Sequence, residues 1–243
     1  MFCQLCGTAN TDTATACASC STPISTIQTG ARTGAGSPAV ADTVKATSKD
    51  AFAAFKTLAV DPVGALPRAC ESLGDAKALR SGVAFGIVSV LCFASAGPML
   101  LGMRMSELYE FLGFAGVLKL ALFAAIPFLG TALGGSGARR ILAGRGGLGS
   151  DCFVAGAALL PASACMLGSG LLGFENVEVI GVLAVFAGCL GILMLYSGYT
   201  RVAKLSERAG SLAVPIVVLL TVWLAKIALS KVLSGSFGGD SPY

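Results

Sequence analysis

Hydrophobic residues are distributed unevenly along this chain. The segment up to Arg80 is mostly polar, and five long apolar runs follow it: Gly82 to Leu101, Phe111 to Leu133, Cys152 to Leu172, Val177 to Thr200 and Leu212 to Ser230. Each run is about 19 to 24 residues long, and about 20 apolar residues cross a bilayer as a helix. The pattern therefore predicts an all-α membrane bundle of five transmembrane helices over residues 81–233.

Two shorter helices are predicted over residues 43–80. In the first, apolar positions recur at helical spacing, at Val44, Thr47, Ala51, Phe55 and Leu58. Asp61 and Pro62 then stand in the order of an N-cap and a first helical residue. We interpret both segments as amphipathic interfacial helices with their lysines toward the lipid headgroups. Soluble helices packed on the cytoplasmic loops are the alternative.

Basic residues flank the apolar runs asymmetrically. If the N-terminus is cytoplasmic, the inner flanks carry Arg68, Lys77, Arg80, Arg139, Arg140, Arg145, Arg201, Lys204 and Arg208. The outer flanks then carry only Arg104 and Lys231. Cytoplasmic loops are enriched in Lys and Arg. We therefore expect the N-terminus inside and the C-terminus outside. No secretory signal pattern opens the chain, which agrees with this orientation.

The composition excludes several classes of protein. Only 12% of the residues are charged, about half of the roughly 25% typical of soluble domains, and the mean hydropathy is +0.80. The chain contains no histidine, so Ser-His-Asp and Cys-His nucleophile arrangements are impossible. Acidic residues at the span edges do not assemble into an acid/base pair, and we expect no enzymatic activity.

Four of the nine cysteines lie within the first twenty residues, as two CxxC pairs: Cys3, Cys6, Cys17 and Cys20. Four thiolates in two such knuckles suit a tetrahedral Zn²⁺ ion. Because so short a segment cannot bury a core, the metal would supply the folding free energy. We predict a structural zinc ribbon over residues 1–23, with disulfides or coincidence as the alternative. The other five cysteines are expected to be small buried hydrophobic side chains.

The predicted ribbon lacks the charge that nucleic-acid binding requires. Residues 1–31 contain no Lys or Arg and include Asp12, whereas binding to nucleic acid displaces counterions with cations. We therefore expect no nucleic-acid partner. A cytoplasmic protein partner, or a purely structural cap, is the better interpretation.

A few charged residues inside or beside the spans are candidate contacts for lipid or ions. Lys119 and Lys226 lie within the outer halves of two spans, and Glu178 lies at the edge of a third. Such residues are often functional, although a lysine can also snorkel to the headgroups. The segment from Gly134 to Gly149 is predicted as a flexible loop that meets anionic lipid; its basic residues are Arg139, Arg140 and Arg145. It lacks the GKS or GKT ending of a nucleotide P-loop.

Small residues recur near four-residue spacing in the spans, as at Gly82/Gly86 and Gly188/Gly191. This spacing lets helices pack closely.

Two resemblances to known families follow from these motifs. The segment from Met1-Phe2-Cys3 to Pro23 looks like the N-terminal zinc-ribbon module of many prokaryotic membrane proteins, although Ala16 and Ser21 depart from its usual pattern. From about Asp61 to Val232 the chain resembles the five-pass Yip family, in the Asp61-Pro62 pair, the five spans and the Tyr196 to Pro215 connection. In eukaryotes that family implies Rab-type GTPase partners and a role in membrane traffic.

Together these observations predict a prokaryotic membrane protein with a ribbon at 1–23, a flexible linker at 24–42 and a short outer tail at 234–243. The expected function is non-enzymatic: the ribbon docks a cytoplasmic partner, and the bundle organises membrane or partners. The alternative is a small transporter or channel that uses Lys119 and Lys226.

Overall fold

The computed structural model describes Thr11, Ala18 and residues 40–100, 105–172 and 176–237. It divides the chain into two compact units, Met1–Thr43 and Val44–Tyr243, and everything below concerns the second. The predicted zinc ligands lie outside the described residues: Cys3, Cys6, Cys17 and Cys20.

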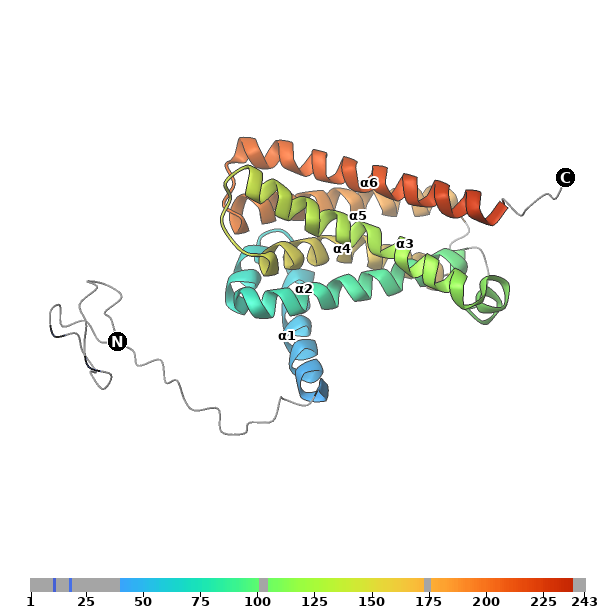
Figure 1. Cartoon of the computed structure of the whole chain (residues 1–243), viewed down its shortest axis with the longest axis horizontal. Helices are drawn as coiled ribbons and strands as arrows, with labels where there is room; N and C mark the ends of the chain where they lie inside the picture. Colours follow the sequence, from blue (N-terminus) through green and yellow to red (C-terminus); the bar gives the residue numbers. More distant parts are fainter. Residues whose placement is uncertain (1–10, 12–17, 19–39, 101–104, 173–175, 238–243) are drawn as a thin grey trace. The chain divides into compact units, whose positions relative to one another are not determined.

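Within these ranges the chain is helical. The elements are α1 (Val40–Val60), α2 (Ala65–Leu100), α3 (Met105–Ile141), α4 (Leu148–Leu171), α5 (Val177–Ser197), the π-helix η1 (Gly198–Val202) and α6 (Glu207–Phe237). Helices α2 to α6 run side by side in alternating directions, and α1 crosses them at one end (Figure 1).

The prediction of five spans is confirmed. Five helices are long and apolar enough to cross a membrane: Ala65–Ala96, Gly116–Ile141, Leu148–Leu171, Glu178–Val202 and Glu207–Ala228. Three of them contain a proline in the helix interior, at Pro127, Pro161 and Pro215. Membrane helices tolerate proline because neighbouring groups satisfy the freed backbone.

Two glycines interrupt the long helices. Gly74 in α2 has φ 68° and Gly113 in α3 has φ 62°, values that glycine adopts without the steric cost of a Cβ. The break at Gly74 separates a first segment, Ala65 to Leu73, from the span that follows. The kink lies inside the second predicted interfacial helix, and the part of that helix after Gly74 is continuous with the first span.

The prediction of a flexible loop from Gly134 to Gly149 is wrong over most of its length. Helix α3 continues to Ile141, and α4 begins at Leu148. The glycines here serve packing: a Cβ at Gly134 would lie 2.8 Å from Val217, and one at Gly135 would lie 2.9 Å from the Tyr199 hydroxyl. Their small size admits α6 and η1 against α3.

The closest helix pair is α2 with α4. A Cβ on Gly82 would overlap the backbone of Cys152 and Phe153, and a Cβ on Gly156 would lie 2.5 Å from the Gly82 carbonyl oxygen. The predicted role of Gly82 in close packing is thus confirmed. At Gly188, by contrast, a Cβ would meet nothing within 4 Å.

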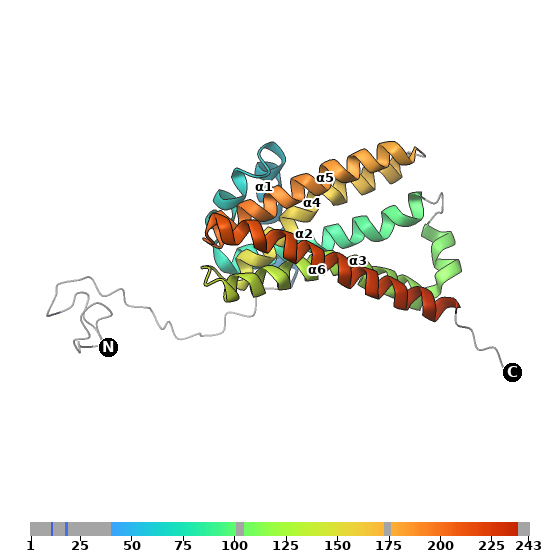
Figure 2. The same cartoon turned by 90° about the horizontal axis from the view of Figure 1, so that it is seen from above.

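The core lies near the end of the bundle where α1 crosses. Phe153 of α4 is fully buried, and its ring centroid lies 5.8 Å from that of Phe85 on α2. Met194 of α5 and Val217 of α6 complete this cluster. Toward the other end, α4 and α5 diverge from α3 and α6 (Figure 2).

Large apolar side chains cover much of the outer surface of the spans, including Leu118, Leu122, Val182, Val185, Phe186, Leu219 and Trp223. Exposure of this extent suits a lipid environment. Of the five cysteines expected to be buried, Cys70 and Cys152 are buried, whereas Cys189 is exposed on α5. A thiol can face lipid because the bilayer interior is as apolar as a protein core.

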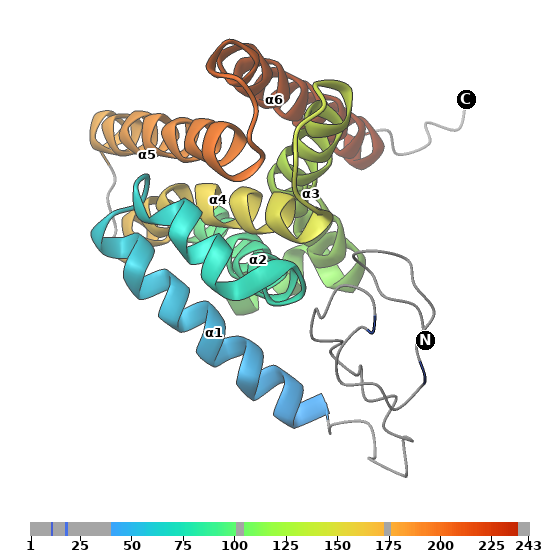
Figure 3. The same ribbon diagram turned by 90° about the vertical axis from the view of Figure 1, so that its left-hand side faces the viewer.

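Helix α1 lies alongside α2 (Figure 3), and its apolar residues are only partly buried. Ala51, Ala54 and Leu58 are buried in the core, whereas Phe52 and Phe55 remain 58% and 43% exposed. Its three lysines are exposed as well: Lys45, Lys49 and Lys56. One face of α1 packs on the bundle, and the neighbouring face combines aromatic and basic groups.

Candidate functional site

Most basic residues of the bundle gather at one end, which we call the basic end. Here α3 passes to α4, α5 passes to α6, and the first span starts (Figure 1). Its basic residues are Lys77, Arg80, Arg139, Arg140, Arg145, Arg201, Lys204 and Arg208. The inner flanks of the sequence prediction therefore meet in space.

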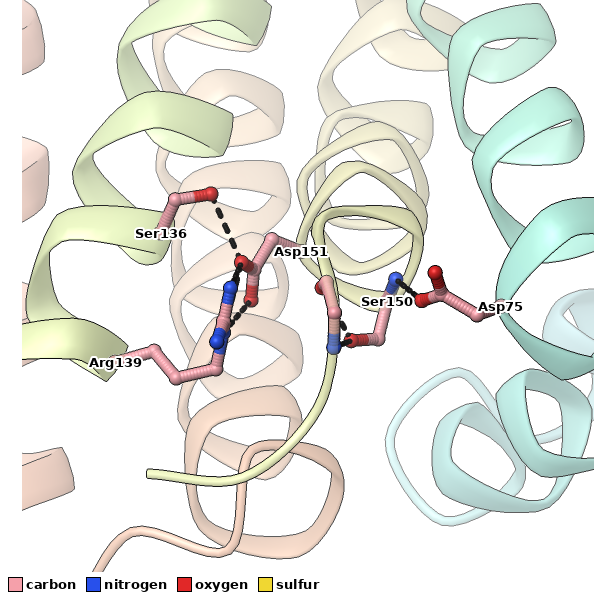
Figure 4. Close-up of polar contacts among 6 residues, drawn as sticks. Asp75, Ser136, Arg139, Ser150 and Asp151 are labelled. Atoms are coloured by element: carbon pink, nitrogen blue, oxygen red, sulfur yellow. Dashed lines mark hydrogen bonds and ion pairs between the residues drawn. The ribbon is translucent and has the colours of Figure 1, made fainter. Parts of the chain in front are cut away.

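A buried ion pair lies at the centre of the basic end (Figure 4). Nη2 of Arg139 donates to Oδ2 of Asp151 at 2.8 Å, and Nε donates to Oδ1 and Oδ2 at 3.2 and 3.0 Å. The Ser136 hydroxyl donates to the same Oδ2 at 2.8 Å. The two charged side chains are only 12% and 4% exposed. This network fixes the end of α3 to the start of α4.

Asp151 also lies in the first turn of α4. The amino end of a helix carries partial positive charge, which favours a carboxylate there. Arg139, the Ser136 hydroxyl and the start of α4 therefore all lie against the Asp151 carboxylate. These contacts make the Asp151 carboxylate a structural link between α3 and α4.

A second carboxylate caps α4 from a different helix. The backbone N–H of Ser150 donates to Oδ1 of Asp75 on α2 at 3.3 Å. The Ser150 side chain meanwhile exchanges hydrogen bonds with the Gly147 backbone, accepting from N–H at 3.1 Å and donating to the carbonyl at 2.7 Å. Asp75 thereby joins α2 to the start of α4.

Further hydrogen bonds join the remaining connections. The Arg145 N–H donates to the Ala203 carbonyl at 2.7 Å, which links the α3–α4 and α5–α6 connections. The Ser197 hydroxyl donates to the Val63 carbonyl at 2.9 Å, linking the end of α5 to the turn between α1 and α2. The connections at the basic end are therefore bonded to one another.

The structure separates the residues predicted to contact lipid or ions. Arg139 is engaged with Asp151, whereas Arg140 and Arg145 are exposed. Lys119 on α3, Lys226 on α6 and Glu178 on α5 are exposed too. In the described ranges, the ion pairs involve other residues, so Glu178 pairs with neither lysine.

Sequence reasoning missed the acidic partners of this end. Asp151 is an isolated acid at the start of an apolar run, twelve positions after Arg139. An acid at the start of a span is energetically costly unless it is paired. The sequence could therefore have indicated that Asp151 has a basic partner. Ser136 and Asp75 gave no comparable signal, because only packing brings them to α4.

Within the described ranges, no group of three His, Cys, Asp or Glu side chains could hold a metal. The two CxxC pairs remain the candidate metal ligands, and they lie outside those ranges. Their donor set, four thiols and no histidine, suits Zn²⁺.

Comparison with known proteins found no matching family model, curated protein or solved structure.

Proposed function

We propose that this protein is a non-enzymatic membrane scaffold. The five-helix bundle anchors the chain in the bilayer, and a cytoplasmic zinc-ribbon head, joined through a flexible linker, docks a protein partner. The observation that carries this proposal is the basic end. There the basic residues of several helix connections lie around the Arg139–Asp151 ion pair and the hydrogen bonds that join these connections. The positive-inside rule favours a cytoplasmic location for such an end.

The chemistry of the hydrogen-bonded polar groups at the basic end supports a scaffold. The Arg139–Asp151 pair is satisfied by its own members and by Ser136. The hydrogen bonds of Asp75 and Ser197 likewise connect elements of the fold. Groups used in this way stabilise the fold and leave no acid/base pair poised for substrate.

The head is proposed from its cysteine spacing and the resemblance to prokaryotic zinc-ribbon modules. Zinc bound by Cys3, Cys6, Cys17 and Cys20 would fold a segment too short to bury a core. The resemblance to the Yip family supports recruitment of partners as the role of the bundle, since that family implies protein partners at membranes.

The alternative, a small transporter or channel, depends on Lys119 and Lys226. Charged residues that serve transport face a bundle interior or a water-filled cavity, whereas neither lysine is buried in the bundle. Lysine stems can extend from such positions to the headgroups, so the exposure favours the scaffold.

A crosslinked pull-down from native membranes tests the docking head. The wild type is compared with a Cys17→Ser/Cys20→Ser variant and with a matched Cys165→Ser/Cys189→Ser control, which removes two thiols from the spans. We expect a cytoplasmic protein to be captured by the wild type and the control and lost from the first variant. Capture of the same proteins by all three would exclude a docking role for the ribbon.

A further inference from the structure

A basic pocket lies beside α1, where this helix crosses the start of the first span. It has a volume of about 200 Å³ and lies between α1 and α2, lined by Ala46, Thr47, Lys49, Asp50, Lys77, Arg80 and Ser81. Two segments about thirty positions apart in sequence thus contribute to one site. We call it the Lys49 pocket.

The lining has an excess of positive charge. Three cations and one carboxylate leave a formal net charge of +2. Nζ of Lys77 lies 3.5 Å from Oδ2 of Asp50, so this pair neutralises itself. Lys49 and Arg80 form no ion pair with any acid in the described ranges. Their charges are available to an anion.

One residue of the pocket lining, Ser81, carries a hydroxyl without a partner. Ser81 is completely buried, and its Oγ makes no hydrogen bond. A buried polar group without a partner costs roughly 1 to 3 kcal/mol, which a ligand oxygen would recover. Two cations and a hydroxyl donor are the groups that bind phosphate oxygens.

The location of the pocket indicates that the phosphate belongs to a lipid. Arg80 and Ser81 directly precede the first apolar run, where a membrane helix passes from headgroups into hydrocarbon. Below Arg80 on the same face of α2, Ile87, Val88 and Leu91 are 56%, 48% and 63% exposed. These side chains lie about two and three helical turns further along, where acyl chains would run.

We propose that the Lys49 pocket binds the phosphate group of an anionic phospholipid, with Lys49, Arg80 and Ser81 on the phosphate and the acyl chains along Ile87, Val88 and Leu91. The lipid would fasten α1 to the first span. The net positive charge selects anionic over zwitterionic headgroups. The site is separate from the docking head, and either assignment can fail without the other.

The test titrates full-length protein in detergent with three probes: phosphatidylglycerol, phosphatidylcholine with the same acyl chains, and inorganic phosphate. Bound ligand is measured by native mass spectrometry. The pocket variant is Lys49→Gln/Arg80→Gln. Its matched control is Lys45→Gln/Lys56→Gln, which makes the same change in net charge on exposed residues of α1 outside the pocket lining.

We expect wild type and control to bind phosphatidylglycerol at least about tenfold more tightly than phosphatidylcholine. The pocket variant loses this preference, and Ser81→Ala weakens it. A Cys17→Ser/Cys20→Ser variant retains it, because the ribbon plays no part.

Three outcomes would overturn the proposal. Equal loss of preference in the pocket variant and its control would mean that general charge attracts the lipid. A preference unchanged in a folded pocket variant would exclude the pocket. Inorganic phosphate binding as tightly as phosphatidylglycerol would assign a free phosphate and overturn the lipid. If the double variant does not fold, Lys49→Gln alone replaces it, since this side chain is exposed.

Discussion

Nη2 of Arg139 and Oδ2 of Asp151 lie 2.8 Å apart, in side chains that are 12% and 4% exposed. Arg140, the next residue, is exposed and forms no ion pair with any acid in the described ranges. One arginine thus holds α3 to α4, and its neighbour is free to meet headgroups.

Asp151→Asn is expected to lower the free energy of unfolding by roughly 3 kcal/mol, because it leaves the Arg139 guanidinium largely buried without its counter-charge. Unfolding of the purified protein by SDS in mixed micelles measures this loss. Combining Asp151→Asn with Arg139→Met should cost less than the sum of the two single changes, because the pair is coupled.

The matched control for this prediction is Arg140→Met, which should change stability by less than about 0.5 kcal/mol. Equal effects of Asp151→Asn and Arg140→Met would show that the ion pair contributes no special stability.

Gly82→Ala is expected to destabilise the bundle by about 1 to 3 kcal/mol, since the added Cβ would overlap the backbone of α4 and force α2 away. The same unfolding assay measures it. Gly188→Ala is the control, because a Cβ there meets nothing within 4 Å, and the change should be neutral or slightly stabilising. Similar losses at both positions would contradict close packing of α2 on α4.

Protein purified without chelator is expected to carry about one Zn²⁺ per chain, measured by elemental analysis. Cys17→Ser should lower this content strongly, because three thiolates bind the ion less tightly than four. Cys165→Ser, a change at a free cysteine of α4, should leave it intact. Zinc-free wild-type protein would disprove the ribbon.

Reporter fusions test the orientation of the basic end. A reporter active only outside the cytoplasm should be inactive after Arg145, at the basic end, and active after Tyr243. The opposite activities would invert the orientation and place the basic end outside. If the two fusions were both active or both inactive, the two positions would lie on the same side of the membrane, which contradicts an odd number of spans between them.

Flux measurements in proteoliposomes test the transport alternative. We expect the wild type, Lys119→Leu and Lys226→Leu to give the same ion flux as protein-free vesicles, because both lysines are exposed and their stems can extend to the headgroups. Flux through the wild type that Lys119→Leu abolishes would favour a transporter over the scaffold.

Parts of the candidate sites were visible in the sequence and parts were not. The positions of Arg139 and Arg140 at the end of a span followed from the apolar pattern, yet the two residues are equivalent in sequence. Helical geometry turns only one of them toward Asp151. The Lys49 pocket was not predictable, because the stripe of α1 does not reveal which helix it contacts or that Arg80 and Ser81 would face Lys49.

The sequence by itself determined the five spans, because crossing hydrocarbon requires a minimum length of apolar helix, and that requirement is local. It also concentrated basic residues in alternate connections. Tertiary structure decided which glycines carry close contacts, that Gly134 to Ile141 remains helical, and which charges are neutralised. Those outcomes depend on the register between neighbouring helices, and the packing of Gly82 against the α4 backbone is what sets that register for α2 and α4.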